Sequence, residues 1–191
     1  FSVTAGAHVL TFQGINSGGG DRAIILDMIS IPAIYTGGPD PTLRMPIVDA
    51  KPGDVITQPV TTDGAYGLKS FILDINYDPA LLTVTNADVK AGSLLKSNWT
   101  VVPEVANGVI HVSAWGVNAI LHNDPGDLLD ITYHVRKGVA GKAALSIDAT
   151  HSALFDVSDG FMLLDARDGQ INIKGKPVRP SLRDSALMSV L

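Results

Sequence analysis

The sequence predicts an all-β protein, an antiparallel sandwich or barrel, and three observations support this prediction. Short stretches of apolar and alternating residues recur along the chain, and turn residues separate nearly all of them. Eighteen of the 19 acidic residues are Asp and only Glu104 is Glu; Asp suits turns, whereas Glu suits helix interiors. The chain also contains 19 Gly and 11 Pro, which favour many short strands joined by turns.

The strand signals follow a segment rich in Pro and Gly, residues 32–42, which we interpret as a linker. The expected strands are residues 43–49, 55–61, 67–77, 81–89, 99–103, 108–115, 127–136, 142–150, 161–165 and 169–173. This regular spacing is typical of a sandwich or barrel and not of alternating strands and helices.

The two ends of the chain differ from this central part. Residues 1–31 hold two strand signals around a turn-rich stretch, which predicts a β-hairpin, and a hairpin alone is marginally stable. The hairpin resembles the last two strands of jelly-roll modules in large bacterial surface proteins, so it is either the end of a truncated module or a hairpin that packs on the main domain. Residues 174–191 read as a linker or tail. Because the chain starts at Phe1 and not at Met, we expect it to be a piece of a longer protein.

Composition and charge exclude several classes of protein. The chain has 191 residues, 46% hydrophobic and 17% charged, which is enough for one principal domain with a sizeable core. A net charge of −5 without a basic stripe argues against nucleic-acid binding. No cysteine is present, which excludes disulfides and thiolate metal sites. No apolar run approaches the roughly 20 residues of a membrane helix, so we expect no membrane insertion.

No motif for catalysis emerges from the sequence. A glycosidase needs two carboxylates that flank the scissile bond, but most Asp residues here, such as Asp54 and Asp78, stand in turns that explain them. The serine hydrolase motif G-x-S-x-G, a Walker loop and a dinucleotide fingerprint are all absent. The five histidines, His8, His111, His122, His134 and His151, show no paired metal-ligand spacing. We therefore expect no enzyme, no catalytic residue and no cofactor.

Calcium needs separate consideration because Asp residues cluster at 156–159 and at 165–168. Neither cluster fits the EF-hand loop, which requires a terminal Glu. A structural calcium ion is therefore not favoured, and no metal ligand is assigned.

Eight motifs in matching order and spacing carry a family resemblance over residues 43–173. They are Val48-Asp-Ala-Lys-Pro-Gly-Asp-Val, Pro59-Val, Gly67-Leu-Lys-Ser-Phe-Ile-Leu-Asp-Ile-Asn-Tyr-Asp-Pro, Leu81-Leu-Thr-Val, Gly92-Ser-Leu-Leu, Asn107-Gly-Val-Ile-His-Val-Ser-Ala-Trp, Leu128-Leu-Asp-Ile-Thr-Tyr-His-Val and Asp168-Gly-Gln-Ile-Asn-Ile. Together they resemble the cohesins. The resemblance implies a nine-stranded sandwich with jelly-roll topology that binds dockerins, which are calcium-loaded helical modules. It also implies that the partner lies on a sheet face built partly from strands 67–77 and 108–115.

Alternation along these two strands separates core residues from this face. Phe71, Leu73, Ile75, Ile110 and Val112 form the inner set. The outward residues that we predict to bind the partner are Ser70, Ile72, Asp74, Asn76, His111, Ser113 and Trp115.

Ile72 and Trp115 are unexpected on a solvated face. Aromatic anchors inside a polar rim are typical of binding hot spots. Alternatively, the loop at 116–126 covers Trp115, Ile72 is an isolated surface residue, and His111 is a solvated histidine without a role in binding. The best-known cohesins have an acidic or polar residue at the position of Ile72, so their dockerin preference does not carry over.

These features favour an extracellular or cell-surface, non-catalytic protein-binding module for a dockerin-type partner, monomeric within a larger protein and, by family resemblance, connected with polysaccharide degradation. A structural spacer in a large adhesin is the second hypothesis. A carbohydrate-binding module is the third, because a sugar platform needs two or three coplanar aromatics and the chain has only two Trp, four Tyr and five Phe.

Overall fold

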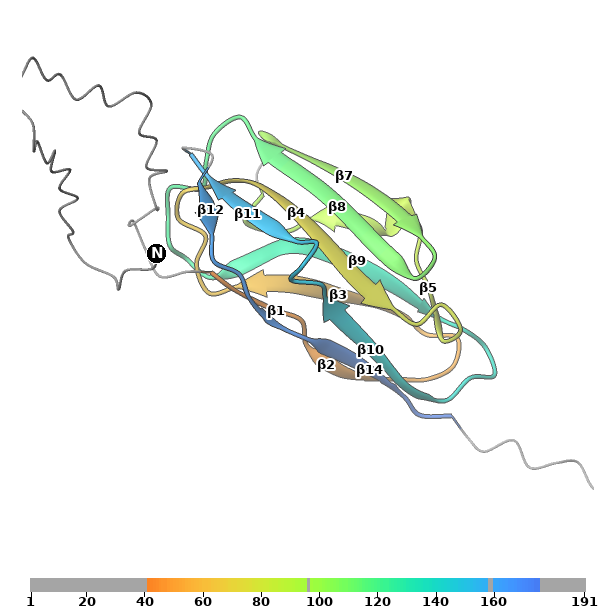
Figure 1. Ribbon diagram of the computed structural model, residues 1–191. Helices are drawn as coiled ribbons and strands as arrows, with labels where there is room; N and C mark the ends of the chain where they lie inside the picture. Colours follow the sequence, from red (N-terminus) through yellow and green to blue (C-terminus); the bar gives the residue numbers. More distant parts are fainter. Residues whose placement is uncertain (1–40, 96, 158–159, 176–191) are drawn as a thin grey trace, which may run out of the picture. The chain divides into compact units, whose positions relative to one another are not determined.

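The computed structural model describes residues 41–95, 97–157 and 160–175 (Figure 1). The chain divides into two units, Phe1–Pro32 and Ala33–Leu191, and all described residues belong to the second. The predicted hairpin at 1–31, nearly all of the linker at 32–42 and most of the tail at 174–191 lie outside the described residues, so they stay predictions.

Two β-sheets face each other and form a sandwich (Figure 1). Sheet A contains β1 (Thr42–Arg44), β3 (Val55–Thr62), β5 (Leu82–Thr83), β6 (Val89–Ala91), β9 (Gly126–Val135) and β13 (Asp165–Arg167). Sheet B contains β2 (Ile47–Ala50), β4 (Leu68–Tyr77), β7 (Trp99–Ala106), β8 (Val109–Gly116), β10 (Gly141–Ile147), β11 (Ala153–Asp156), β12 (Phe161–Met162) and β14 (Gly169–Ile173). The described part holds no α-helix, only a 3-10 turn, η1 (Asn86–Asp88). The predicted all-β sandwich is confirmed.

Several predicted strands are broken where the chain bends or changes sheet. The segment 43–49 is not one strand, because the chain leaves sheet A after Arg44 and enters sheet B at Ile47. Pro46 lies at this crossing, where its missing N–H costs no ladder hydrogen bond. Likewise η1 divides 81–89, and the chain crosses from β12 in sheet B to β13 in sheet A within 161–165. If β1 and β2, β5 and β6, and β13 and β14 are each treated as one interrupted strand, the sandwich has the nine expected strands. The hairpin formed by β11 and β12 is an addition to these nine.

The first and last strands lie side by side in both sheets and run parallel. β1 pairs with β13 in sheet A, and β2 pairs with β14 in sheet B. The other described strand pairs are antiparallel. The chain therefore enters the sandwich near one end of these strands and leaves it at the other.

The core lies between the sheets and includes the predicted inner residues. Phe71 is 1% exposed, and Leu73, Ile75, Ile110 and Val112 are fully buried, which confirms the register inferred from alternation. The ring centroids of Phe71 and of Trp99 on β7 lie 6.0 Å apart, so the inner side of the edge strand β7 also packs on the core.

The register of this hairpin is determined by its turn. Asn107 and Gly108 both adopt positive φ angles, 52° and 81°, as a tight two-residue hairpin turn of the favoured type requires. A Cβ atom on Gly108 would lie 2.9 Å from the carbonyl oxygen of Tyr77, so only glycine fits the close approach to β4. The turn thus places β7 and β8 beside β4.

Candidate partner-binding face

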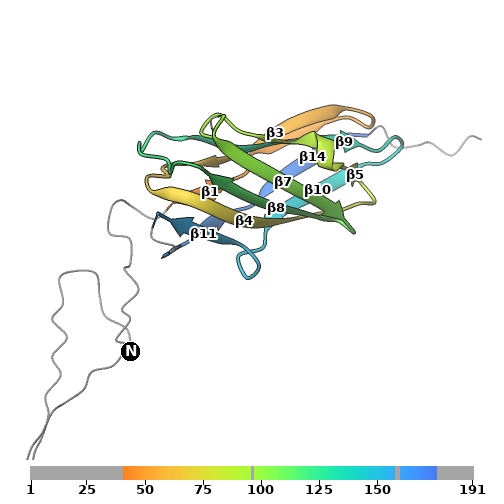
Figure 2. The same cartoon turned by 90° about the horizontal axis from the view of Figure 1, so that it is seen from above.

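All seven predicted site residues lie on the outer face of sheet B. In the β4–β8 ladder, Ser70 is opposite Trp115, Ile72 opposite Ser113 and Asp74 opposite His111, while Asn76 is opposite Val109. Phe71, Leu73 and Ile75 alternate with them on β4, and Ile110, Val112 and Ala114 on β8, and these six are buried, so the seven side chains share one face. Figure 2 shows β7, β8, β4 and β11 side by side in this sheet.

Trp115 is 48% exposed, so the loop at 116–126 does not cover it. Ile72 is not isolated either. It lies opposite Ser113 on one side and Ala153 of β11 on the other, and it is half-buried between them. The two unexpected apolar residues therefore belong to a larger surface.

This larger surface is an apolar band that crosses the sheet from β7 to β12. Its residues are Val102, Trp115, Ile72, Ala153, Phe155 and Phe161. Val102 lies opposite Ser113 and is 48% exposed. The rings of Phe155 and Phe161 lie 5.0 Å apart, and Phe161 is 72% exposed. Ser113 lies between Val102 and Ile72, and Ser70 lies between Trp115 and Phe155. A soluble sheet face normally carries mostly polar residues, so this set of apolar side chains across five strands indicates a contact surface.

The sequence analysis missed four of these six residues, although signals for them existed. Alternation within the predicted strand 99–103 already places Val102 outward with Thr100. The residues Asp156 and Gly160 are a turn signal in the sequence, and in the structure a carboxylate oxygen of Asp156 accepts a hydrogen bond from the N–H of Gly160 at 2.9 Å.

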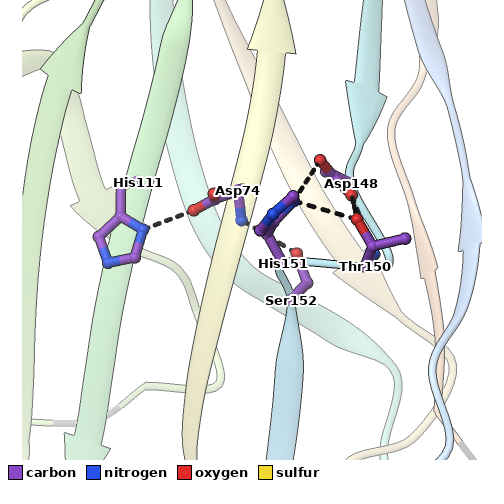
Figure 3. A network of polar contacts seen from close by, with 6 residues as sticks. All are labelled: Asp74, His111, Asp148, Thr150, His151 and Ser152. Carbon is purple, nitrogen blue, oxygen red and sulfur yellow. Dashed lines mark hydrogen bonds and ion pairs between the residues drawn. The ribbon is translucent and has the colours of Figure 1, made fainter.

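A row of charged residues lies beside the apolar band on the same face. Glu104 of β7 lies opposite His111, and His111 lies opposite Asp74. The His111 Nδ1 atom is 2.5 Å from a carboxylate oxygen of Asp74 (Figure 3). The Nε2 atom of His111 is 3.4 Å from the hydroxyl of Ser113. Asp148 continues the row beyond β4, and we call Glu104, Asp74 and Asp148 the acidic row.

The loop at residues 148–152 holds Asp148 in place, at the point where β10 leaves β4 and β11 joins it. The N–H of Asp148 donates to the carbonyl of Asp74 at 2.8 Å, and the N–H of Asp74 donates to the Ser152 hydroxyl at 3.0 Å. His151 Nδ1 lies 2.8 Å from Asp148, whose other oxygen accepts a hydrogen bond from Thr150 (Figure 3). The loop is thus fastened to the middle of the candidate face.

These contacts shift two pKa values. Hydrogen bonds from Thr150 and then His151 lower the pKa of the Asp148 carboxyl. The hydrogen bond to Asp148 and its negative charge raise the pKa of His151, and the nearby charge of Asp74 adds to the rise. Each shift favours the charged form of its group, the carboxylate of Asp148 and the imidazolium of His151.

The outer face of sheet A is different in kind. Thr57 and Thr132 form a hydrogen bond across β3 and β9 at 2.9 Å, and His134 contacts Asp88 at 3.0 Å. Val55 is the only exposed large hydrophobic residue on the described strands of this sheet. The apolar band thus distinguishes one face of the sandwich from the other.

The described parts of the chain contain neither a metal centre nor a helix that could span a membrane. No group of three or more His, Cys, Asp or Glu side chains there could hold a metal ion. Asp159, a member of one Asp cluster, lies outside the described residues. No helix in those parts is long and apolar enough to cross a membrane.

Comparison with known proteins agrees with this architecture. The family model for the cohesin domain matches residues 41–173. A non-cellulosomal cohesin from the archaeon Archaeoglobus fulgidus has 23% identity and a TM-score of 0.61, with 71% of this chain and 91% of that chain covered.

Two solved complexes are also similar. A type I cohesin–dockerin complex from Clostridium thermocellum gives 23% identity and a TM-score of 0.60, covering 71% of this chain and 99% of that one. The sixth cohesin of scaffoldin B from Acetivibrio cellulolyticus, solved with a Cel5 dockerin, gives 19% identity and a TM-score of 0.61, covering 71% and 99%. A comparison with curated proteins gave no match. The match over residues 41–173 shows that the chain belongs to the cohesin family, whose domains are non-catalytic binding modules.

Proposed function

We propose that this chain binds a dockerin-type protein module through the outer face of sheet B. The apolar band is the observation that carries this proposal, because it exposes Trp115, Val102 and Phe161 together on one sheet face. Similar solved cohesins are complexes with dockerins. In this proposal the module is part of an extracellular or cell-surface protein and recruits dockerin-bearing proteins, such as enzymes of polysaccharide degradation.

Trp115 and Ile72 are the proposed central anchors. They stand on neighbouring strands, and Ser70 and Ser113 lie between the apolar side chains of the band. The pair Asp74 and His111, two residues further along the ladder than Ile72 and Ser113, forms the polar margin. An apolar centre within a polar rim excludes water from the contact and concentrates the binding energy in few residues.

The same face argues against the two alternative functions. A pure spacer would have no use for an exposed apolar band, which favours aggregation. A sugar platform needs coplanar rings, but the planes of Phe155 and Phe161 are inclined at 44° to each other.

The test is calorimetric titration of the chain against a panel of dockerins and, separately, soluble glycans. Trp115→Ala should weaken dockerin binding by about thirtyfold or more, mostly through a faster off-rate. Val55→Ala, which removes an exposed apolar side chain from sheet A, is the matched control and should leave binding unchanged. Dockerin binding that Trp115→Ala does not weaken would move the site to another face. Glycan binding alone would identify a sugar-binding module, and no binding to either would favour the spacer.

A further inference from the structure

Strand β7 forms one edge of sheet B, because β8 is its only strand partner among the described elements (Figure 1). It has eight residues, whereas the other described strands with a single partner, β2, β5, β6, β12 and β13, have two to four. An edge strand presents unpaired N–H and C=O groups, and a strand of another chain can add to a long one. Among these edges, β7 is therefore the one that most needs protection.

The sequence of β7 favours such pairing. It reads Trp99-Thr-Val-Val-Pro-Glu-Val-Ala, which is rich in residues that suit strands, and its only charged residue is Glu104. Val102 is half-exposed on the outer face. A long edge strand of this composition is a predicted site of self-association unless something blocks it.

The hairpin turn determines which backbone groups of β7 point away from β8. Ala106 and Val109 flank the two-residue turn Asn107–Gly108, so they form the hydrogen-bonded pair that closes the hairpin. In an antiparallel ladder, hydrogen-bonded and non-hydrogen-bonded pairs alternate. The N–H and C=O groups that point outward from the edge therefore belong to alternate residues of β7: Trp99, Val101, Pro103 and Val105.

Two of these four residues offer no free donor to an added strand. Proline has no N–H, so Pro103 interrupts the row of donors. The N–H of Val105 is already engaged, because it donates to the side-chain oxygen of Asn86 at 2.8 Å. Residues 55–60 of β3, which β1 does not reach, are the other long open edge, and they also contain a proline, Pro59. β7 combines its proline with a covering side chain.

The covering side chain comes from the opposite sheet. Asn86 is the first residue of η1, which connects β5 and β6 of sheet A. A carboxylate oxygen of Asp88 accepts hydrogen bonds from the N–H and the hydroxyl of Thr85 at 2.8 and 2.7 Å, and its other oxygen lies 3.0 Å from Nε2 of His134 on β9. η1 is thus fixed to sheet A, and from there Asn86 reaches the edge of sheet B. Its Oδ1 atom occupies the position that a carbonyl oxygen of an added strand would take.

From these relationships we infer that Asn86 and Pro103 close the edge of β7 to strand addition, and that without them a second copy of this chain would pair there. Two copies related by a two-fold axis would join their β7 strands antiparallel and form one continuous sheet. The inference concerns the edge of sheet B and does not depend on what the outer face of this sheet binds.

The test compares variants of the full chain by sedimentation velocity at increasing concentration. Asn86→Ala removes the acceptor and Pro103→Val restores the missing donor, so the double variant should associate to a dimer at concentrations at which the wild type remains monomeric. Asn86→Asp keeps an acceptor oxygen at the same position and should behave as the wild type. Thr57→Ala, which removes an exposed side-chain hydrogen bond from sheet A, is the matched control for lost stability and should not associate.

Amide hydrogen exchange locates the effect. The amide of Val105 should exchange about tenfold faster in Asn86→Ala than in the wild type, because it loses its acceptor. In the concentrated double variant, the amides at positions 101, 103 and 105 should become protected, which would place the contact on β7.

Several results would overturn the inference. One is a double variant that associates no more strongly than the wild type, and another is association that leaves the amides of β7 unprotected. An amide of Val105 that exchanges equally fast in the wild type and in Asn86→Ala would also contradict it. If the double variant is insoluble, the single variants decide, because each should associate more strongly than Asn86→Asp and Thr57→Ala, and equal behaviour of all four would overturn the inference.

Discussion

Phe155 and Phe161 lie opposite each other on β11 and β12 with their ring centroids 5.0 Å apart, and Phe161 is 72% exposed. The pair lies on the far side of β4 from Trp115, because β11 joins β4 on the edge opposite β8. The candidate face is therefore wider than the two strands from which it was predicted. An aromatic residue that is mostly in water contributes little to folding and much to a contact that covers it.

Phe161→Ala should consequently separate binding from stability. We expect a change of no more than about 0.5 kcal/mol in the free energy of unfolding. The dockerin affinity should fall by about tenfold or more. Urea denaturation and calorimetric titration measure the two effects. Unchanged affinity would restrict the binding face to β4, β7 and β8.

Phe71→Ala should have the opposite effect. Phe71 is 1% exposed and packs against Trp99, so its removal leaves a cavity and should cost about 3–5 kcal/mol. Ile72→Ala, one residue further on the outer face, is the matched control and should cost about 1 kcal/mol or less. If the denaturation curve of Phe71→Ala coincides with that of the wild type, Phe71 does not belong to the core and the register of β4 is inverted.

The His151–Asp148 pair should make the loop at 148–152 sensitive to pH. The folded pKa of His151 is raised above 6.5, so its contribution to stability is present below about pH 6.5 and lost as the pH rises through the folded value. The folded pKa of Asp148 is lowered below 3.8, so its contribution is present above about pH 4 and lost as the pH falls through the folded value. The pair is therefore most effective in mildly acidic solution.

NMR titration of the histidine ring protons checks this. The pKa of His151 should be above its ordinary value in the wild type and should return towards it in Asp148→Asn. Asp124→Asn, which changes a carboxylate outside this network, is the control and should leave the raised pKa of His151 unchanged. An unshifted His151 in the wild type would contradict the network in Figure 3.

Residues 1–31 should be dispensable for the sandwich. A chain that starts at Pro41 keeps the amide of Thr42, which donates to a carboxylate oxygen of Asp63 at 2.9 Å, and it keeps all strands of both sheets. Its melting temperature, followed by circular dichroism, should equal that of the full chain. A clearly lower melting temperature or an insoluble product would show that the hairpin belongs to the folded domain.

The register of β4 and β8 could be predicted from the sequence because each strand has one buried face. Alternation then places every second residue in the core, and a slip by one residue would expose Phe71 and Leu73. The seven predicted site residues followed directly from this register. Their role in binding stays a prediction.

The wider extent of the face could not be predicted in the same way. The predicted strand 99–103 stops at Pro103, but β7 continues to Ala106, because β7 pairs only with β8 and an edge strand tolerates a proline. The predicted strand 142–150 runs through the turn at Asp148, and no strand was predicted at 153–156, where β11 lies. The contacts between Asp74 and the loop at 148–152 join residues more than 70 positions apart in sequence, and periodicity carries no information about such pairs.

The parallel pairing of the terminal strands has a mechanical consequence. Ile47 lies opposite Gln170 and Ala50 opposite Ile173, so the chain enters and leaves the sandwich at opposite ends of adjacent strands. Tension applied to the two ends pulls β2 and β14 past each other and loads their backbone hydrogen bonds in shear. Bonds loaded in shear share the force and break together, whereas bonds that are peeled apart break one at a time. Because forced unfolding is governed by the unfolding rate, a domain of this topology is suited to transmit tension between the segments on either side of it while sheet B stays folded.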